Sequence, residues 1–275
     1  MCSFKKGAFW RRLFFMGVKT LLIVSSTLSA MNLHAEPLCR TTSYDQHVRI
    51  DYVVDGDTIS LVNGDSVRLI GIDTPEIGRD GQAHQQGALA ARHYLEDLLR
   101  LEVKYPIVYG AERHDHFGRS LAHLFLPAGE NVQALLLKRG LGTSLTIPPN
   151  LGFLDCYQQL SRQARANRRG IWGLRQYQAV KVTELSGKER GYRIIEGPIV
   201  AIGKSRSSIW LKLENNFAIR IRRGDLEYFH GLQFSNLKGM HIQARGLLYK
   251  RNKQLRMRLR HKVDLRILTT PQGTS

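Results

Sequence analysis

Alternating apolar and polar positions predict short strands in the first part of the chain. Residues 48–54 alternate up to Asp55-Gly56, and such alternation is typical of a half-buried strand. Asn63-Gly64 stands between two apolar runs, which is a strong signal for a hairpin turn. We expect strands over residues 48–54, 59–62, 67–72, 102–109 and 120–126.

Three other segments have the spacing of helices. Residues 82–99 carry apolar side chains every three to four positions, which places them near one helix face. Asn131 can cap a second helix that ends at Gly140, and we expect a third helix over residues 153–167. Strands and helices in this order predict an α+β arrangement, a small and mostly antiparallel barrel with three helices.

The alternation returns in the last hundred residues. Residues 176–190 are polar, and we expect them to form a linker. After it, Ile209 and Leu211 fall on one side of a strand and Trp210 on the other. Asn215-Asn216 marks a turn. Short alternating runs at 209–214, 217–222, 240–249 and 254–260 predict a second small barrel.

Length and composition limit the class of protein. The chain has 275 residues, which favours two domains over one. Its 43% hydrophobic and 23% charged residues suit a globular protein with a core, which excludes a wholly disordered chain and a coiled coil. Beyond residue 40 no apolar run reaches the roughly 18 residues of a membrane helix, which excludes a multi-span membrane protein.

The net charge of +18 is not spread evenly. Residues 36–175 carry 16 basic and 16 acidic side chains, whereas residues 176–275 carry 20 and 7. A basic excess confined to one segment indicates a polyanionic partner for that segment. The alternative is a solvated basic surface without a partner.

The first 35 residues have the order of a targeting segment. Lys5, Lys6, Arg11 and Arg12 precede an apolar run, and Ala35 follows as a small residue at a plausible cleavage site. We expect a signal peptide over residues 1–35 and export to the periplasm or the outside of the cell. The alternative is an uncleaved N-terminal anchor that tethers the protein to a membrane.

Export also bears on the cysteines. Cys2 leaves with the signal peptide, and Cys39 and Cys156 remain. An even pair in an oxidising compartment favours a disulfide between them, the alternative being two free thiols.

Carboxylates and arginines gather in the middle segment. Asp57 and Asp73 each stand next to a predicted strand, and two carboxylates at one barrel mouth can hold a hard cation such as Ca²⁺ or Mg²⁺. A third carboxylate, Glu76, can accept a proton from water. The forked donors of Arg68 and Arg119 match the oxygens of a phosphate. This set suits metal-assisted hydrolysis of a phosphate ester.

Residues 47–173 resemble the staphylococcal nuclease (thermonuclease) family. The resemblance rests on Asp55-Gly-Asp57-Thr58, Arg68 with Asp73-Thr-Pro-Glu76, Arg113-x-Asp115-x-Phe-Gly-Arg119, Arg139-Gly-Leu141 and Gly170-Ile-Trp172. It implies a five-stranded OB-type β-barrel with three helices. It also implies a catalytic domain over residues 36–175, which the linker at 176–190 joins to the second barrel at 191–275.

The resemblance implies a metal site. Asp57 and Asp73 are expected to bind one Ca²⁺ ion through carboxylate oxygens, and Thr74 through its backbone carbonyl. Asp55 is expected to lie just outside these ligands. Other divalent cations are alternatives to Ca²⁺.

The resemblance also implies an activity. Glu76 is the expected general base, and Arg68 and Arg119 are expected to hold the scissile phosphate. The family cleaves DNA and RNA and leaves 3′-phosphate ends, and no obligate protein partner is implied. The alternatives are a catalytically inactive nucleic-acid-binding module and an envelope protein that uses its basic tail on anionic lipid.

The polar side of the predicted second barrel is a candidate nucleic-acid surface. Residues two apart on a strand lie about 6.6 Å apart on one face, so alternating arginines form rows and aromatic rings beside them can stack on bases. The layout resembles an OB-fold nucleic-acid-binding domain. The candidate residues are Trp210, Arg220, Arg222, Tyr249, Arg256, Arg258 and Arg260.

Overall fold

The computed structural model describes residues 39–269. The expected signal peptide or anchor at 1–35 and Cys2 lie outside the described residues. Within 39–269, no helix has both the length and the apolar character of a membrane span. The described residues belong to one compact unit, Pro37–Ser275.

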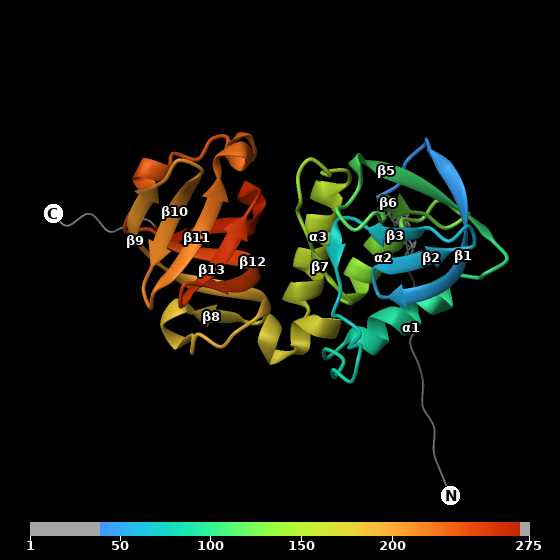
Figure 1. Ribbon diagram of the computed structural model, residues 1–275, viewed down its shortest axis with the longest axis horizontal. Helices are drawn as coiled ribbons and strands as arrows, with labels where there is room; N and C mark the ends of the chain where they lie inside the picture. The colour runs from blue at the N-terminus through green and yellow to red at the C-terminus, as the bar shows by residue number, and fades with distance from the viewer. Residues whose placement is uncertain (1–38, 270–275) are drawn as a thin grey trace, which may run out of the picture. The chain divides into compact units, whose positions relative to one another are not determined.

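Five strands in the first half close into a barrel in the order β1-β2-β3-β6-β5 (Figure 1). Strands β3 and β6 run parallel, and the other neighbours run antiparallel. The strands span β1 (Gln46–Asp55), β2 (Thr58–Leu61), β3 (Ser66–Leu69), β5 (Lys104–His114) and β6 (Ser120–Leu124). The hairpin predicted at Asn63-Gly64 joins β2 to β3, and Gly64 has a φ of 87°.

Three α-helices accompany this barrel, which confirms the predicted α+β architecture. They are α1 (Ala88–Leu98), α2 (Val132–Arg139) and α3 (Leu154–Ala166). Asn131 caps α2 by accepting a hydrogen bond from the backbone N–H of Ala134 at 2.9 Å. Helix α1 begins six residues later than expected, because Gly87 adopts a φ of 97° that a helix cannot accommodate.

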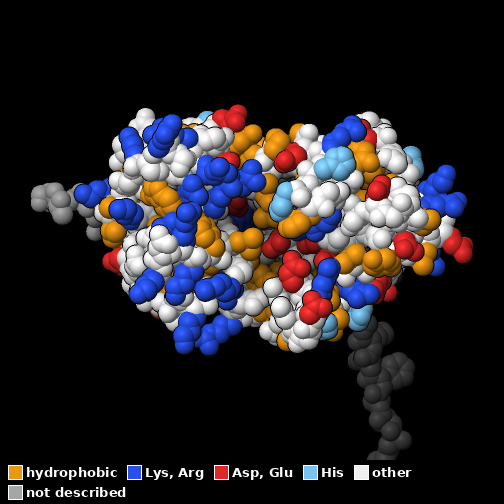
Figure 2. Space-filling model, in the orientation of Figure 1, with side chains coloured by type: hydrophobic (Ala, Val, Ile, Leu, Met, Phe, Trp, Pro, Cys, Tyr) orange, Lys and Arg blue, Asp and Glu red, His pale blue; other side chains and the backbone are white. Residues whose placement is uncertain are grey.

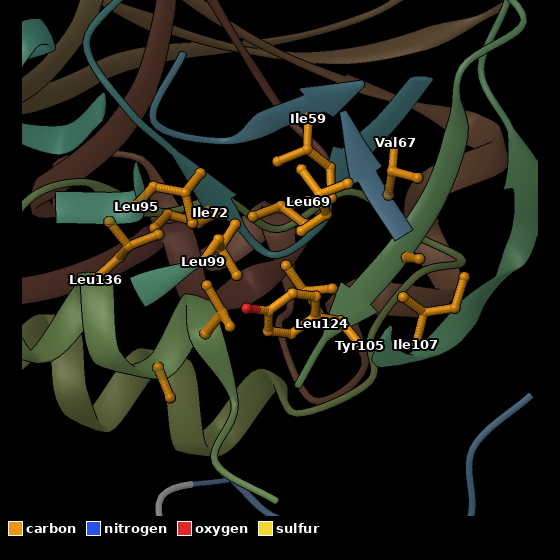
Figure 3. Close-up of a cluster of buried hydrophobic side chains, with 14 of the residues drawn as sticks. Ile59, Val67, Leu69, Ile72, Leu95, Leu99, Tyr105, Ile107, Leu124 and Leu136 are labelled. Atoms are coloured by element: carbon orange, nitrogen blue, oxygen red, sulfur yellow. The ribbon is translucent and has the colours of Figure 1, made fainter. Parts of the chain in front are cut away.

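The core of the first barrel lies between the strands and the helices (Figure 3). Ile59 and Leu69 point inward from β2 and β3, and neither side chain is exposed. Leu95 of α1 and Leu136 of α2 meet them and are equally buried. These contacts fix the strand ends that carry the predicted carboxylates, because a close-packed core leaves few alternative positions.

A disulfide fastens the beginning of the described chain to α3. Cys39 and Cys156 are bonded, with their Cα atoms 5.9 Å apart. Cys39 is buried in the core of the first barrel. The two cysteines are 117 positions apart in the sequence, so the bond limits the conformational freedom of almost the whole first barrel in the unfolded chain.

The second half forms a seven-stranded sheet in the order β14-β12-β13-β11-β10-β9-β8. An additional pairing of β12 with β9 closes five of these strands, which confirms a second OB-like barrel (Figure 1). The strands are β8 (Ala179–Lys181), β9 (Gly191–Lys204), β10 (Ser208–Leu213), β11 (Phe217–Arg222), β12 (His241–Arg251), β13 (Gln254–Leu259) and β14 (Leu265–Thr269).

The inward and outward sides of this barrel follow the predicted alternation. Ile209 and Leu211 are buried, whereas Trp210 between them is partly exposed. The turn predicted at Asn215-Asn216 lies between β10 and β11, and both residues have positive φ angles, 50° and 52°. Two-residue turns with positive φ match the twist of a hairpin, and asparagine tolerates that conformation.

The segment expected to be a linker is mostly exposed but is anchored at a few buried positions. Between residues 176 and 190, β8 runs parallel to β9, and Tyr177 and Val182 are buried. Tyr177 belongs to an apolar cluster with Trp172, Tyr192 and Ile194. The polar composition of the segment conceals these few apolar anchors, which attach it to both barrels.

Candidate active site

The turn between β1 and β2 presents two carboxylates. Asp55 is the last residue of β1, and its Oδ1 accepts the backbone N–H of Asp57 at 3.0 Å. A Cβ atom at Gly56 would lie 2.6 Å from the Cβ of Ala91 and 2.7 Å from Oγ1 of Thr74. Only glycine therefore fits between the two aspartates, where the turn passes against α1.

Asp57 connects this turn to the segment after the hairpin. Its Oδ2 accepts hydrogen bonds from the backbone N–H of Thr74 at 2.8 Å and from Oγ1 of Thr74 at 3.0 Å. The same oxygen lies 3.1 Å from Nη2 of Arg68. Asp57 is 3% exposed, so its position is set by the fold.

Arg68 lies between the two predicted metal ligands. It projects from β3, and its Nη2 is 3.1 Å from Asp57 and 3.5 Å from Oδ1 of Asp73. Its Nη1 donates to the backbone carbonyls of Leu69 and Ile72. Asp73 is the last residue of β4 (Ile72–Asp73), a short strand that pairs with β7 (Thr143–Ser144). The structure thus brings Asp57, Arg68, Asp73 and Thr74 together.

The electrostatics of this cluster favour added positive charge. The pKa of Asp57 is raised to about 7, mainly by burial and also by the charges of Asp55 and Asp73, while Arg68 opposes the rise. Burial also raises the pKa of Asp73. Burial alone would lower the pKa of Arg68, but Asp57 and Asp73 outweigh it and raise that pKa. Three carboxylates therefore share one buried guanidinium group.

The residues present fit a hard divalent cation. All the available donors are oxygens, and Oδ1 of Asp57 accepts only a weak bond of 3.3 Å from the hydroxyl of Thr58. Asp57 and Asp73 both lie within 3.5 Å of the same Arg68 nitrogen. No group of three or more His, Cys, Asp and Glu side chains within residues 39–269 has metal-binding geometry. A site here would therefore be completed by backbone carbonyl and water oxygens, which Ca²⁺ and Mg²⁺ accept.

Glu76 lies beside the cluster on an exposed stretch after β4. Its backbone N–H donates to Oε1 of Gln85 at 3.2 Å, and the backbone N–H of Gln85 donates to its carbonyl at 3.0 Å. Partial burial raises the pKa of the Glu76 carboxylate, and the charges of Asp55 and Asp73 add to this rise. Gln85 could not be predicted from the sequence, because it falls in a polar stretch at the start of a predicted helix and matches no motif.

Arg119 is held in place by Asp115. Oδ2 of Asp115 accepts a bond from Nε of Arg119 at 2.8 Å, and its Oδ1 accepts the backbone N–H groups of Phe117 and Arg119. Burial alone would raise the pKa of Asp115, but the hydrogen bonds from Arg119 and Phe117 lower it. The motif that contains Asp115 indicates no role for it, and the structure gives it a positioning role.

Arg68 and Arg119 line one groove of about 520 Å³. Three arginines that were predicted to lie on a separate surface also line this groove, namely Arg222, Arg258 and Arg260. The other predicted surface residues, Trp210, Arg220, Tyr249 and Arg256, are not among the residues that line it. Sequence patterns could not indicate this meeting, because it depends on how β11 and β13 pack against the first barrel.

Arg119 also lines a second groove, of about 550 Å³. Asp55 lines it together with Arg79 and Arg92, two residues that sequence reasoning did not single out. Arg92 forms an ion pair with Glu96 at 2.8 Å on α1. The arrangement as a whole places buried carboxylates around Arg68, which shares a groove with Arg119, and it is suited to binding and attacking an anionic ester.

Comparison with known proteins agrees with this geometry. Residues 66–173 match a family model described as staphylococcal nuclease homologue. The chain is 33% identical over 129 residues to the thermonuclease of Staphylococcus intermedius, a match covering 44% of this chain and 72% of that protein.

Two proteins of Bacillus subtilis (strain 168) are also similar. The chain is 31% identical over 137 residues to SPbeta prophage-derived endonuclease YokF, a match covering 47% of this chain and 45% of that protein. It is 30% identical over 133 residues to endonuclease YncB, which covers 46% of this chain and 61% of that protein. The chain thus spans only about half the length of these two relatives. The motifs, the barrel and the thermonuclease match together establish that the chain belongs to the staphylococcal nuclease family.

Proposed function

We propose that this protein is a metal-dependent nuclease that hydrolyses phosphodiester bonds of DNA and RNA. The observation that carries the proposal is the cluster of Asp57, Arg68, Asp73 and Thr74, with Glu76 and Arg119 beside it. The relatives named as endonucleases support the substrate class.

In this proposal Asp57 and Asp73, with the backbone carbonyl of Thr74, hold one Ca²⁺ ion. When bound, the ion stabilises negative charge that develops on the phosphate oxygens. Asp55 supports the site from outside, because it fixes the backbone of Asp57. The negative surplus among the buried carboxylates supports a divalent ion, since binding it relieves their mutual repulsion.

Arg68 and Arg119 bind the scissile phosphate from the groove that both residues line. A guanidinium group offers two parallel donors, which match two phosphate oxygens and stabilise the charge of the transition state. Asp115 orients Arg119 for this contact. Glu76 takes the proton from the attacking water, and its raised pKa makes it a better proton acceptor than an ordinary glutamate.

Further parts of the proposal concern products and location. Cleavage on the 5′ side of the phosphodiester leaves 3′-phosphate ends. We also propose export, with residues 1–35 as a signal peptide or a membrane anchor, and the disulfide between Cys39 and Cys156 supports an oxidising compartment.

A digestion assay tests the activity. Plasmid DNA and a long RNA are incubated with the full chain in Ca²⁺ or in excess chelator. The products are then treated with a phosphatase, which releases phosphate only if their 3′ ends carry it. We expect cleavage with Ca²⁺ alone, and a fall in kcat of about 10²–10⁴-fold for Glu76→Gln. Glu102→Gln, an exposed glutamate outside the site, serves as the matched control. Full activity in chelator would refute the metal assignment, and binding without cleavage would favour an inactive nucleic-acid-binding module.

A further inference from the structure

The outer face of the second barrel carries aligned basic and aromatic side chains. Trp210 of β10 is opposite Arg220 of β11, and Arg220 is opposite Arg258 of β13. In the next row, Arg256 of β13 is opposite Tyr249 of β12. Lys and Arg side chains gather on the part of the surface where Figure 1 draws β10, β11 and β13 (Figure 2). The rows predicted from alternation therefore lie side by side on one sheet.

Two guanidinium groups lie close to the indole ring of Trp210. The guanidinium carbon of Arg256 is 4.8 Å from the centre of the indole ring, and that of Arg220 is 5.4 Å from it. Its Nε1 donates to Oγ of Ser205 at 3.3 Å, which fixes the orientation of the ring. The ring lines a shallow groove of about 330 Å³ with Lys204, Lys212 and Arg256. A flat ring surrounded by cations suits an unpaired base and the phosphates beside it.

The same face continues into the groove that contains Arg68 and Arg119. Arg258 and Arg260 line it and share one carboxylate, Asp225, at 2.8 Å and 3.7 Å. Within the described residues, the buried Nε atoms of Arg258 and Arg260 have no hydrogen-bond acceptor. Burial lowers the pKa of Arg260, and the charges of Arg258 and Arg222 lower it further. These arginines repel one another, and an anion in the groove would relieve the repulsion.

Trp210 and the groove are close enough for one ligand. Two strand spacings, about 10 Å, separate Trp210 from Arg258 across the sheet. Arg222 follows Arg220 by two residues on β11, so the two share a face about 6.6 Å apart. No acidic residue occurs in β10, β11 or β13. These strands therefore contribute only basic and neutral side chains to the path. The carboxylates beside it are Asp225, which pairs with Arg258 and Arg260, and Glu112 and Asp115, which line the groove.

We propose that a single-stranded polynucleotide crosses this face, with a base stacked on Trp210 and its phosphates bound by Arg222, Arg258 and Arg260 as it enters the groove. The groove end of this path rests on the proposed nuclease function, because Arg68 and Arg119 then hold the next phosphate. Single strands are favoured over duplexes, because the ring of Trp210 can stack only on a base that is not paired within a helix.

A binding assay without catalysis tests the path. Fluorescein-labelled oligodeoxythymidylate of about 20 nucleotides is titrated with the full chain in excess chelator, and Kd is measured by fluorescence anisotropy at several salt concentrations. Trp210→Ala is expected to raise Kd by about 5- to 150-fold, the range for loss of one stacked base, and Trp210→Phe to raise it less. Arg222→Ala is expected to reduce the slope of log K against log salt by about 0.7, the value for one single-strand phosphate.

Arg190→Ala is the matched control, because it removes the same charge from an exposed loop that does not line the groove. Its Kd is expected to equal that of the wild type. Arg222 is exposed, so its replacement does not endanger the fold, and circular dichroism verifies folding of each variant. Wild-type Kd for both Trp210→Ala and Arg222→Ala would overturn the proposal. An equal loss of affinity for duplex DNA in Trp210→Ala would overturn the single-strand assignment.

The assay separates this proposal from the nuclease function. Because chelator is present throughout, the measured Kd does not depend on cleavage. A chain that binds oligothymidylate through Trp210 but never cleaves DNA supports the path and refutes the nuclease. A chain that cleaves DNA while both variants bind like the wild type refutes the path and leaves the nuclease function intact.

Discussion

At the scale of single residues, the position of Arg119 depends on one carboxylate. Asp115 accepts hydrogen bonds from both Nε and the backbone N–H of Arg119. The side chain of Arg119 is 33% exposed, and its cation lies 5.5 Å from the ring centre of Phe117. Because Nε is used by Asp115, the two terminal nitrogens are left to face a ligand. The side chain is thus oriented before any phosphate arrives.

This geometry makes Arg119→Lys a severe change. A lysine retains the charge but presents no paired donors and cannot keep the contact that Nε makes with Asp115. We expect kcat to fall by about 10²–10³-fold, the range for loss of one donor to the transition state. The control is Arg113→Lys, an exposed arginine near the end of β5, just before this turn, which should retain wild-type kcat. Equal kcat values for the two variants in a steady-state DNA digestion would contradict the role of Arg119.

The individual site residues differ in how far the sequence could predict them. Asp57, Asp73 and Glu76 belong to short motifs at strand ends, so their approach follows from local structure. The side chain of Gln85 acts through one hydrogen bond, to the backbone of Glu76, and no motif marks it. Asp115 belongs to a motif, but the motif does not show that its carboxylate holds Nε of Arg119. Their roles become visible only when the partners are placed in space.

At the scale of elements, a buried hydrogen-bond chain joins β6, α3 and the start of α2. Nδ1 of His123 lies 2.8 Å from the hydroxyl of Tyr157, and that hydroxyl donates to Oδ1 of Asn131 at 3.0 Å. Asn131 is also the cap of α2. Since Tyr157 gives its proton to Asn131, Nδ1 of His123 is the donor to Tyr157. Burial lowers the pKa of His123 to about 3, so the ring stays neutral in the folded protein.

The buried histidine predicts a loss of stability in mild acid. The unfolded chain binds a proton at His123 with the ordinary pKa, whereas the folded protein does so only near pH 3. The contribution of neutral His123 to the free energy of unfolding is therefore complete at neutral pH and falls as the pH drops below the ordinary pKa. From pH 7 to pH 5 this residue alone should lower the free energy of unfolding by about 2 kcal/mol. Urea unfolding at both pH values measures it.

His123→Gln should be less stable at pH 7, because the chain to Tyr157 is disturbed, yet its stability should fall less between pH 7 and pH 5. His93→Gln, which replaces an exposed histidine of α1, is the control and should keep the wild-type dependence. If His123→Gln and the wild type lose the same free energy over this range, His123 is not the acid-sensitive group.

Elements were predictable where local chemistry decides them. The turns at Asn63-Gly64 and Asn215-Asn216 and the cap at Asn131 follow from backbone preferences of those residues. The start of α1 was placed too early, because the apolar spacing continues through Gly87 while the backbone does not. The polar composition of residues 176–190 predicts a linker. Its few buried anchors could not be predicted, because they depend on contacts with distant strands.

At the scale of the whole molecule, one apolar cluster belongs to both barrels. Trp172 ends the motif of the first barrel, and Tyr192 and Ile194 lie on β9 of the second. Trp172 is 1% exposed and Ile194 is fully buried. Arg165 of α3 also donates to Oε1 of Gln243 on β12 at 3.0 Å. The proposed catalytic groove is lined from both barrels and requires such a joint, because their arginines must keep a fixed separation.

The shared cluster predicts that the two barrels unfold together. Ile194→Ala removes a buried side chain from the joint and should lower the free energy of unfolding by about 2–5 kcal/mol. Because the cluster couples both barrels, hydrogen exchange in moderate denaturant should accelerate in β5 of the first barrel as well as in β12 of the second. Ile267→Ala, at a 41% exposed position on β14, should change neither. Acceleration confined to β12 would mean that the barrels are independent and that the groove between their arginines is not held rigidly.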